Sequence, residues 1–190
     1  MVMETRPERF QRLIEPLHDR TLAFARCLCR TLGDGDDLFQ EAMLRAFGKL
    51  DDLRDEKAFR SWLYRIVISV HRSRCRRAFW RRLIPLLDDD GDGAPDAAVS
   101  GNDYRTGAWV PDAVDASRRA RHALGKLDAV QREAIVLFEI EGWQVEEIAA
   151  LHDVSLSAIK SRLARGRARL RELYDAQPAL ATQLVTPEVP

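Results

Sequence analysis

An acidic stretch at residues 83–117 divides this 190-residue chain into two parts. It contains one basic residue, Arg105, and no sustained apolar period, while glycine and proline recur throughout. Its acidic residues are Asp88, Asp89, Asp90, Asp92, Asp96, Asp103, Asp112 and Asp115. A structureless segment of this length is unusual inside one compact domain. We therefore expect a flexible acidic linker between two small domains.

The segments on either side of this linker are basic, although the whole chain has 30 Lys and Arg against 30 Asp and Glu. Residues 59–82 contain eight arginines and no acid, and residues 155–171 contain one lysine and five arginines without an acid. Two basic segments separated by an acidic one indicate two separate contacts with a polyanion.

Apolar residues recur at steps of three and four in both parts, which predicts an all-α fold. We expect a first domain at 8–82, the linker at 83–117, a second domain at 118–175 and a mobile tail at 176–190. No apolar run approaches the roughly 18 residues of a membrane span, and the N-terminus lacks a secretory signal, so we expect a cytoplasmic protein without membrane insertion. The three cysteines fit neither a disulfide framework nor a paired zinc motif, and we expect no metal and no cofactor.

Three helices are expected in the first domain. Gly33 is expected to end the first, whose apolar residues are Phe24, Leu28 and Leu32. The second is expected to begin near Asp34 or Asp36, where a carboxylate suits the helix N-terminus. Its inward stripe is Phe39, Met43, Ala46, Phe47 and Leu50. The third runs from about Glu56 into the arginines, with an inward stripe of Phe59, Trp62, Leu63, Ile66 and Val70.

The outward faces of these helices offer two candidate surfaces. The second helix presents Asp37, Gln40, Glu41, Leu44 and Arg45. An exposed leucine within such a stripe fits either a docking surface or an ordinary solvated face. The arginines of the third helix can follow a nucleic-acid backbone, and Phe79 and Trp80 are the aromatic residues expected to be exposed beside them.

The second domain has the pattern of a helix-turn-helix. Leu124, Leu127, Val130, Ile135 and Ile140 are expected to face inward in one or two helices that end at Gly142. A short helix then spans 145–151, and Ser155 can cap the next helix by accepting from amides of its first turn. The inward stripe of this last helix is expected to be Leu156, Ile159, Leu163 and Leu170. Its outer side can enter a major groove with Ser157, Lys160, Ser161, Arg162 and Arg165.

Two sets of motifs resemble those of bacterial sigma factors. Residues 36–47 (DDLFQEAMLRAF) and 59–66 (FRSWLYRI), followed by the arginine run, are similar to the second region of that family. Leu127, the QRE of 131–133, the EIA of 147–149 and the IKSRL of 159–163 resemble the fourth region. No third region lies between them, a plan similar to that of the extracytoplasmic-function (ECF) group.

The resemblance implies a sigma factor, and not an enzyme, that binds core RNA polymerase and directs promoter-specific initiation under the control of an anti-sigma factor. The outward stripe of the second helix would dock on the clamp helices of the largest polymerase subunit. The melted minus-ten strand would be held by Arg65, Ser69, Arg72, Arg76 and Arg77. The outer residues of the last helix would read the minus-thirty-five duplex, and the second domain would touch the flap of the other large subunit.

Two other functions would explain part of these sequence features. A dimeric helix-turn-helix repressor or activator explains the second domain but leaves the first unexplained. A metal-dependent hydrolase would use Asp34, Asp36, Asp37 and Glu41 to hold magnesium. It would also need a base and a closed pocket, and the four histidines lie at no recognisable ligand spacing.

Overall fold

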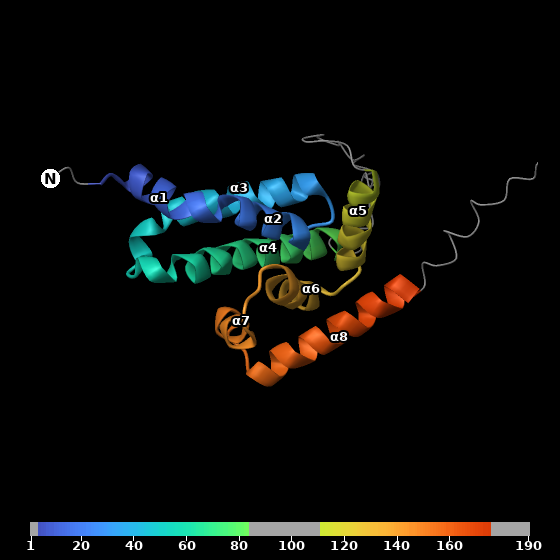
Figure 1. Ribbon diagram of the computed structural model, residues 1–190. Coiled ribbons are helices and arrows are strands. Elements are labelled where there is room, and N and C mark those ends of the chain that lie inside the picture. Colours follow the sequence, from blue (N-terminus) through green and yellow to red (C-terminus); the bar gives the residue numbers. More distant parts are fainter. Residues whose placement is uncertain (1–3, 84–110, 176–190) are drawn as a thin grey trace, which may run out of the picture. The chain divides into compact units, whose positions relative to one another are not determined.

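The computed structural model describes residues 4–83 and 111–175, and it separates into two compact units with the division between Trp109 and Val110 (Figure 1). Every regular element in the described residues is a helix, which confirms the all-α prediction. Most of the expected linker, and the whole of the expected tail, lie outside the described residues. Helix α5 (Pro111–Gly125) begins inside the segment expected to be linker, because proline at the first helical position suits a helix start.

The first unit packs helices along one another around a core of Phe24, Leu28, Leu38, Leu63 and Tyr64, all fully buried. Its elements are α1 (Arg6–Ile14), η1 (Glu15–Leu17), α2 (His18–Leu28), α3 (Leu32–Gly48), η2 (Leu50–Asp52), η3 (Glu56–Ala58) and α4 (Phe59–Leu83). The expected inward stripe of the third helix is confirmed, since Phe59, Leu63 and Val70 are buried and Trp62 and Ile66 are half-buried.

The expected helix end at Gly33 is wrong. Helix α2 ends at Leu28, and Thr31 caps the start of α3 by accepting a hydrogen bond from the amide of Asp34 at 3.1 Å. Leu32 therefore belongs to α3, and Gly33 lies in its first turn with open space where a side chain would stand. The N-cap preference of threonine outweighs the tendency of glycine to end helices at this position.

Helices α2 and α3 are in close contact at Gly35. A β-carbon built there would lie 2.5 Å from the α-carbon of Arg26, so a side chain at this position would force the helices apart. The same arginine donates from Nε to Asp36 at 2.6 Å. Glycine is therefore needed here for backbone proximity, and the adjacent ion pair fastens α2 to α3.

Ion pairs also fasten α1 to the segment before α4. Glu56 accepts hydrogen bonds from Arg9 at 2.8 Å and from Arg12 at 3.1 Å, and Arg12 also donates to Glu4 at 2.8 Å. The hydrogen bonds from Arg12, and then those from Arg9, hold the pKa of Glu56 below its ordinary value. The N-terminal helix is thus tied to the start of α4 by exposed charges as well as by apolar contact.

The second unit consists of α5, α6 (Ala129–Ile135), the π-helical segment η5 (Val136–Ile140), α7 (Val145–His152) and α8 (Leu156–Asp175). Its core includes Leu127, Leu137, Ile148, Ile159 and Leu163, all buried. Helix α6 and the last helix, α8, pack together, and α8 also contacts α7 and α5.

The π-helical segment explains why one expected core residue is exposed. The amide of Glu141 donates to the carbonyl of Val136 at 3.0 Å, five residues back. Because this wider winding advances each residue by a smaller angle than an α-helix does, the apolar stripe drifts out of register. Ile140 is consequently 52% exposed, and its expected inward position is wrong. The predicted end at Gly142 is confirmed, since that residue adopts a φ of +69°.

Candidate nucleic-acid and polymerase interfaces

The turn between α7 and α8 has the geometry of a helix-turn-helix. Asp153 ends α7 in the left-handed conformation, with φ 54° and ψ 52°, which aspartate tolerates better than most residues. The amide of Val154 donates to the carbonyl of Ala149 at 3.1 Å. The hydroxyl of Ser155 accepts from the amide of Ala158 at 3.3 Å, so the predicted cap of α8 is confirmed.

Helix α8 buries one face and exposes the other. Ile159 and Leu163 are buried, as the periodicity predicted, and Gly166 lies against Ile135. Leu156 is 44% exposed, so its expected place in the core is wrong. It is the first residue of α8, and the covered part of the stripe begins one turn later, at Ile159.

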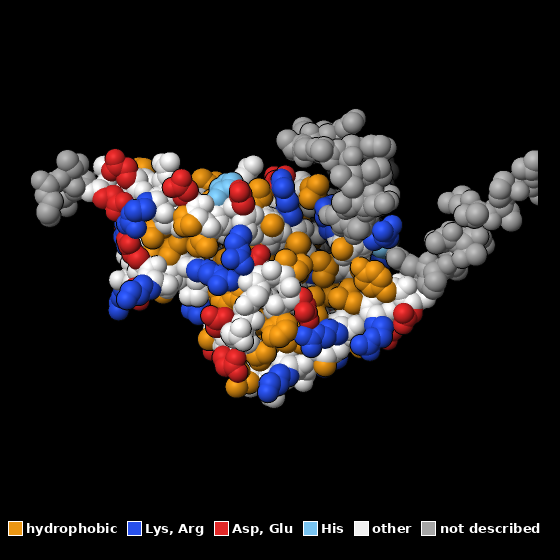
Figure 2. All heavy atoms as spheres, viewed as in Figure 1, with side chains coloured by type: hydrophobic (Ala, Val, Ile, Leu, Met, Phe, Trp, Pro, Cys, Tyr) orange, Lys and Arg blue, Asp and Glu red, His pale blue; other side chains and the backbone are white. Residues whose placement is uncertain are grey.

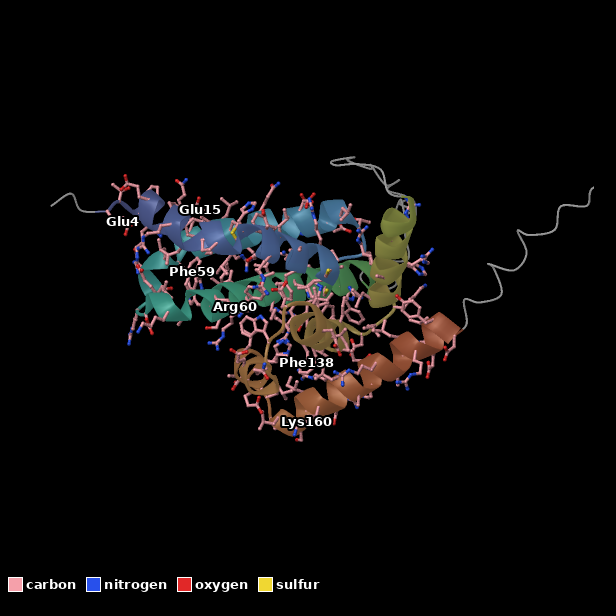
Figure 3. All side chains as sticks on the ribbon, viewed as in Figure 1. Glu4, Glu15, Phe59, Arg60, Phe138 and Lys160 are labelled. Atoms are coloured by element: carbon pink, nitrogen blue, oxygen red, sulfur yellow. The ribbon has the colours of Figure 1, made fainter. Side chains whose placement is uncertain are left out.

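Four of the five residues expected to read the minus-thirty-five element lie on the exposed side of α8: Ser157, Lys160, Ser161 and Arg165. Figure 3 shows Lys160 projecting from this helix. The space-filling view shows basic side chains spaced along α8 with acidic ones near them (Figure 2). Two of the later arginines pair with acids, Arg167 with Glu139 at 2.7 Å and Arg169 with Glu172 at 2.8 Å. The outward residues of the first turns of α8 are therefore better placed to contact DNA than the ion-paired Arg167 and Arg169.

Arg162 differs from the other four residues of this set. Its side chain is half-buried, and its guanidinium donates to Nδ1 of His152 at 3.1 Å. On the other side of the ring, Nε2 of His152 lies 3.8 Å from a carboxylate oxygen of the fully buried Glu133. These three side chains connect α6, α7 and α8 beneath the outer face. The predicted short helix ended at residue 151, and no contact of His152 was expected.

A buried arginine of α6 contacts the end of α5. Arg132 is buried and donates to the carbonyls of Leu124 at 2.8 Å, Gly125 at 3.1 Å and Leu127 at 3.1 Å. These carbonyls lie at and just after the C-terminal end of α5, where the negative end of the helix dipole favours a cation. In the sequence Arg132 appears only as part of the QRE of 131–133, so its role at the end of α5 was not predicted.

The five residues expected to hold the minus-ten strand divide into two groups on α4. Arg65, Ser69, Arg72 and Arg76 recur at steps of four, three and four, which places them along one line of the helix. Arg65, Ser69 and Arg76 are exposed, and Arg72 is half-buried. Arg77 lies off this line, and its Nη2 is 3.7 Å from Glu41 of α3. The fifth member of the expected minus-ten set is therefore directed partly toward α3.

Two aromatic residues extend the exposed side of α4 toward its C-terminal end. Phe79 is 61% exposed and Trp80 57%, which confirms their expected exposure. Their ring centroids lie 5.8 Å apart in an edge-to-face arrangement. Aromatic rings next to arginines provide faces on which unpaired bases stack.

Four members of the expected docking stripe, Asp37, Gln40, Leu44 and Arg45, are exposed on α3. Leu44 is 75% exposed, more than any other large hydrophobic side chain among the described residues. Glu41 is the exception, because it is half-buried and its carboxylate accepts from Arg45 at 2.8 Å and from Arg74 of α4 at 2.9 Å.

Three of the four carboxylates considered for magnesium are engaged with separate partners within the first unit. Asp34 accepts from the hydroxyl of Thr31, Asp36 pairs with Arg26, and Glu41 pairs with arginines. No group of three or more His, Cys, Asp or Glu side chains in the described residues is arranged to hold a metal ion. No helix within residues 4–83 and 111–175 is long and apolar enough to cross a membrane.

Comparison with known proteins identifies both units. Residues 13–81 match the model of sigma-70 region 2, and residues 117–170 match that of sigma-70 region 4. The ECF RNA polymerase sigma factor SigM of Mycobacterium tuberculosis is 35% identical over 164 residues, which cover 86% of this chain and 76% of that protein. The RNA polymerase sigma factor CnrH of Cupriavidus metallidurans is 34% identical over 143 residues, which cover 75% of this chain and 74% of CnrH.

Two solved structures resemble the fold. The sigma factor RpoE of Bartonella quintana, in complex with the anti-sigma factor NepR, has a TM-score of 0.63 and 27% identity, covering 90% of this chain and 99% of RpoE. CnrH in complex with the cytosolic domain of CnrY has a TM-score of 0.59 and 30% identity, covering 88% of each chain.

Regions 2 and 4 in this order, on two helical units, define a sigma-70-type initiation factor, a class of protein that directs transcription and is not a catalytic enzyme. The relatives and solved structures narrow the class, and this chain belongs to the ECF family of RNA polymerase sigma factors. It directs promoter-specific transcription initiation, and its partners are core RNA polymerase and promoter DNA.

Proposed function

We propose that this chain docks on the clamp helices of the largest polymerase subunit through the outer face of α3. Asp37, Gln40, Leu44 and Arg45 all lie exposed on that face. A leucine that is 75% exposed, surrounded by charged and amide groups, matches the composition of a binding surface with an apolar centre and a polar rim. The expected flap contact of the second unit belongs to the same proposal.

The DNA contacts proposed here use the outward faces of α4 and α8. The line of Arg65, Ser69, Arg72 and Arg76 would hold the backbone of the melted minus-ten strand, with Arg77 at its edge. On α8, Ser157, Ser161 and Arg165 would read base edges in the major groove, and Lys160 would contact phosphates. Arg162 would support this face from below through His152.

The observation that carries the proposal is that the two units each present an exposed basic helix face of their own. Two separate faces fit two separated promoter elements, whereas a simple helix-turn-helix repressor needs only α8 and a dimer contact. Because polymerase and chromosome are the partners, the proposed place of action is the cytoplasm. Control by an anti-sigma factor is also proposed, since RpoE and CnrH were solved with NepR and with CnrY.

Transcription with purified core polymerase and a library of promoters tests the proposal. The chain should direct initiation at one class of promoter, and should bind that promoter tightly only in the presence of core enzyme. Native mass measurement gives the oligomeric state of the free chain, which distinguishes a sigma factor from a dimeric repressor. A dimer that binds operator DNA tightly by itself, without redirecting polymerase, would refute the proposal.

A further inference from the structure

The first residue of α8 is an exposed leucine. Leu156 is 44% exposed, although its spacing predicted a place in the core. Among the large hydrophobic side chains of α8, which the structure describes throughout, only Tyr174 in the last turn is also exposed. Tyrosine carries a hydroxyl that can form hydrogen bonds, whereas leucine offers only apolar surface. Leu156 is therefore the large side chain of α8 whose exposure a set of polar DNA contacts does not explain.

The surroundings of Leu156 favour a negatively charged partner. Residues 154–171 contain one lysine, five arginines and no acid. Lys160 lies one turn after Leu156 on the same side of α8, where it is exposed and projects from the helix (Figure 3). Positive charge at this density complements a polyanion. The partner that fits Leu156 is therefore a polyanion that also carries an apolar group.

Leu156 lies at the N-terminal end of the second helix of the helix-turn-helix. Helical side chains tilt toward the N-terminus, so the first residue points past the end of the helix and no earlier turn covers it. On either side of Leu156, Ser155 and Ser157 hold their hydroxyl oxygens 3.0 Å apart, and Ser155 also accepts from the amide of Ala158. In a helix-turn-helix, the N-terminal residues of the second helix contact base edges in the major groove. This position brings Leu156 to the bases and not only to the phosphates.

Thymine provides the apolar group that a leucine at this position can recognise. In the major groove the base pairs differ in their hydrogen-bond donors and acceptors, and thymine alone adds a C5-methyl group. Leucine cannot read donors or acceptors, but its branched end can cover a methyl group and remove it from water. Cytosine at the same place would leave this apolar contact unmade.

We infer that Leu156 is a specificity-determining residue that recognises the methyl group of a thymine in the minus-thirty-five duplex. This inference rests on the proposed function, in which α8 reads that duplex, and it adds an apolar base contact to the polar ones. Lys160 would contact a phosphate from the same side of α8, while Leu156 would distinguish thymine from cytosine at one base pair.

Replacement of thymine by uracil tests the inference, because it removes the methyl group and leaves every hydrogen-bonding group of the base in place. Each thymine of the minus-thirty-five element, on both strands, is replaced singly in a labelled promoter, and the dissociation constant of the full chain with core polymerase is measured by titration. At one position the wild type should bind the uracil promoter about fourfold more weakly, the factor that corresponds to burial of one methyl-sized group. Leu156→Ala should bind the thymine promoter more weakly than the wild type does, and should bind both promoters equally at that position.

Two variants separate the methyl contact from other effects. Leu156→Met keeps an apolar side chain of similar volume and should retain the preference for thymine. Lys160→Ala removes a positive charge from the same side of α8, so it should weaken binding to the thymine and uracil promoters by the same factor and keep their ratio. Uracil placed in the spacer between the two promoter elements should leave the affinity of each variant unchanged.

Three results would overturn the inference. The first is equal affinity of the wild type for thymine and uracil at every position, and the second is an unchanged ratio of the two affinities in Leu156→Ala. The third is loss of that ratio in Leu156→Met and Lys160→Ala as well, which would assign the effect to the position of α8. In all three cases the wild type still prefers its own minus-thirty-five element to a scrambled one. Failure of the wild type to do so would refute the proposed function instead.

Discussion

Replacement of Leu44 by alanine should weaken polymerase binding without unfolding the protein. Fully burying a leucine side chain stabilises by about 1.5 to 3 kcal/mol. Because Leu44 is already 75% exposed in the folded chain, its removal should lower the free energy of unfolding by less than about 1 kcal/mol. Docking can cover the exposed part, so the loss of binding free energy should be about 1 to 2 kcal/mol, a roughly 5- to 30-fold weaker affinity.

Titration of labelled chain with an isolated fragment that carries the clamp helices of the largest subunit measures this loss directly. Leu156→Ala is the matched control, because Leu156 is an exposed leucine of α8 in the second unit. Its affinity for the fragment should equal that of the wild type. Wild-type affinity in Leu44→Ala, with an unchanged unfolding temperature, would show that this face of α3 is not where polymerase binds.

Three further predictions concern helix packing, base recognition and the pH dependence of stability. Gly35→Ala should lower the free energy of unfolding by about 1 to 3 kcal/mol, because the added methyl group meets the backbone of Arg26. Gly33→Ala, whose methyl group enters open space, should raise it by up to about 1 kcal/mol. Equal denaturation midpoints for the two variants would contradict this prediction. Arg165→Ala should cost about 1 to 3 kcal/mol at the cognate minus-thirty-five element and relax base preference, and an equal loss on all base-substituted sites would indicate phosphate contact only. Glu56 has a folded pKa below its ordinary value of 4.5, so its stabilisation is present above pH 4.5 and is lost as pH falls through the folded pKa. The difference in unfolding free energy between wild type and Glu56→Gln should therefore shrink on acidification, and parallel curves would refute it.

The apolar periodicity was sufficient to predict the helical fold because it reports burial directly. Ile159, Leu163, Leu63 and Val70 are buried as expected. The prediction failed where winding or capping departs from a regular α-helix. The π-helical turns before Ile140 are formed by hydrogen bonds that leave no periodic signal of their own.

The candidate surfaces were predictable as faces but not as individual contacts. The spacing of residues on α3 placed Leu44 outward, and the structure agrees. The same spacing could not show that Glu41 meets Arg74, because that contact joins residues 33 positions apart in the chain. The half-burial of Arg162 likewise depends on His152 and Glu133, which come from other helices.

The link from Arg162 through His152 to Glu133 has a consequence for engineering. These contacts hold α8 to the other helices of the second unit along one side of α8, while Ser157, Ser161 and Arg165 lie on a different side. Randomising those three positions could retune promoter choice on an unaltered scaffold. A library that also varied Arg162 would change both the promoter preference and the position of α8, and the two effects would not be separable.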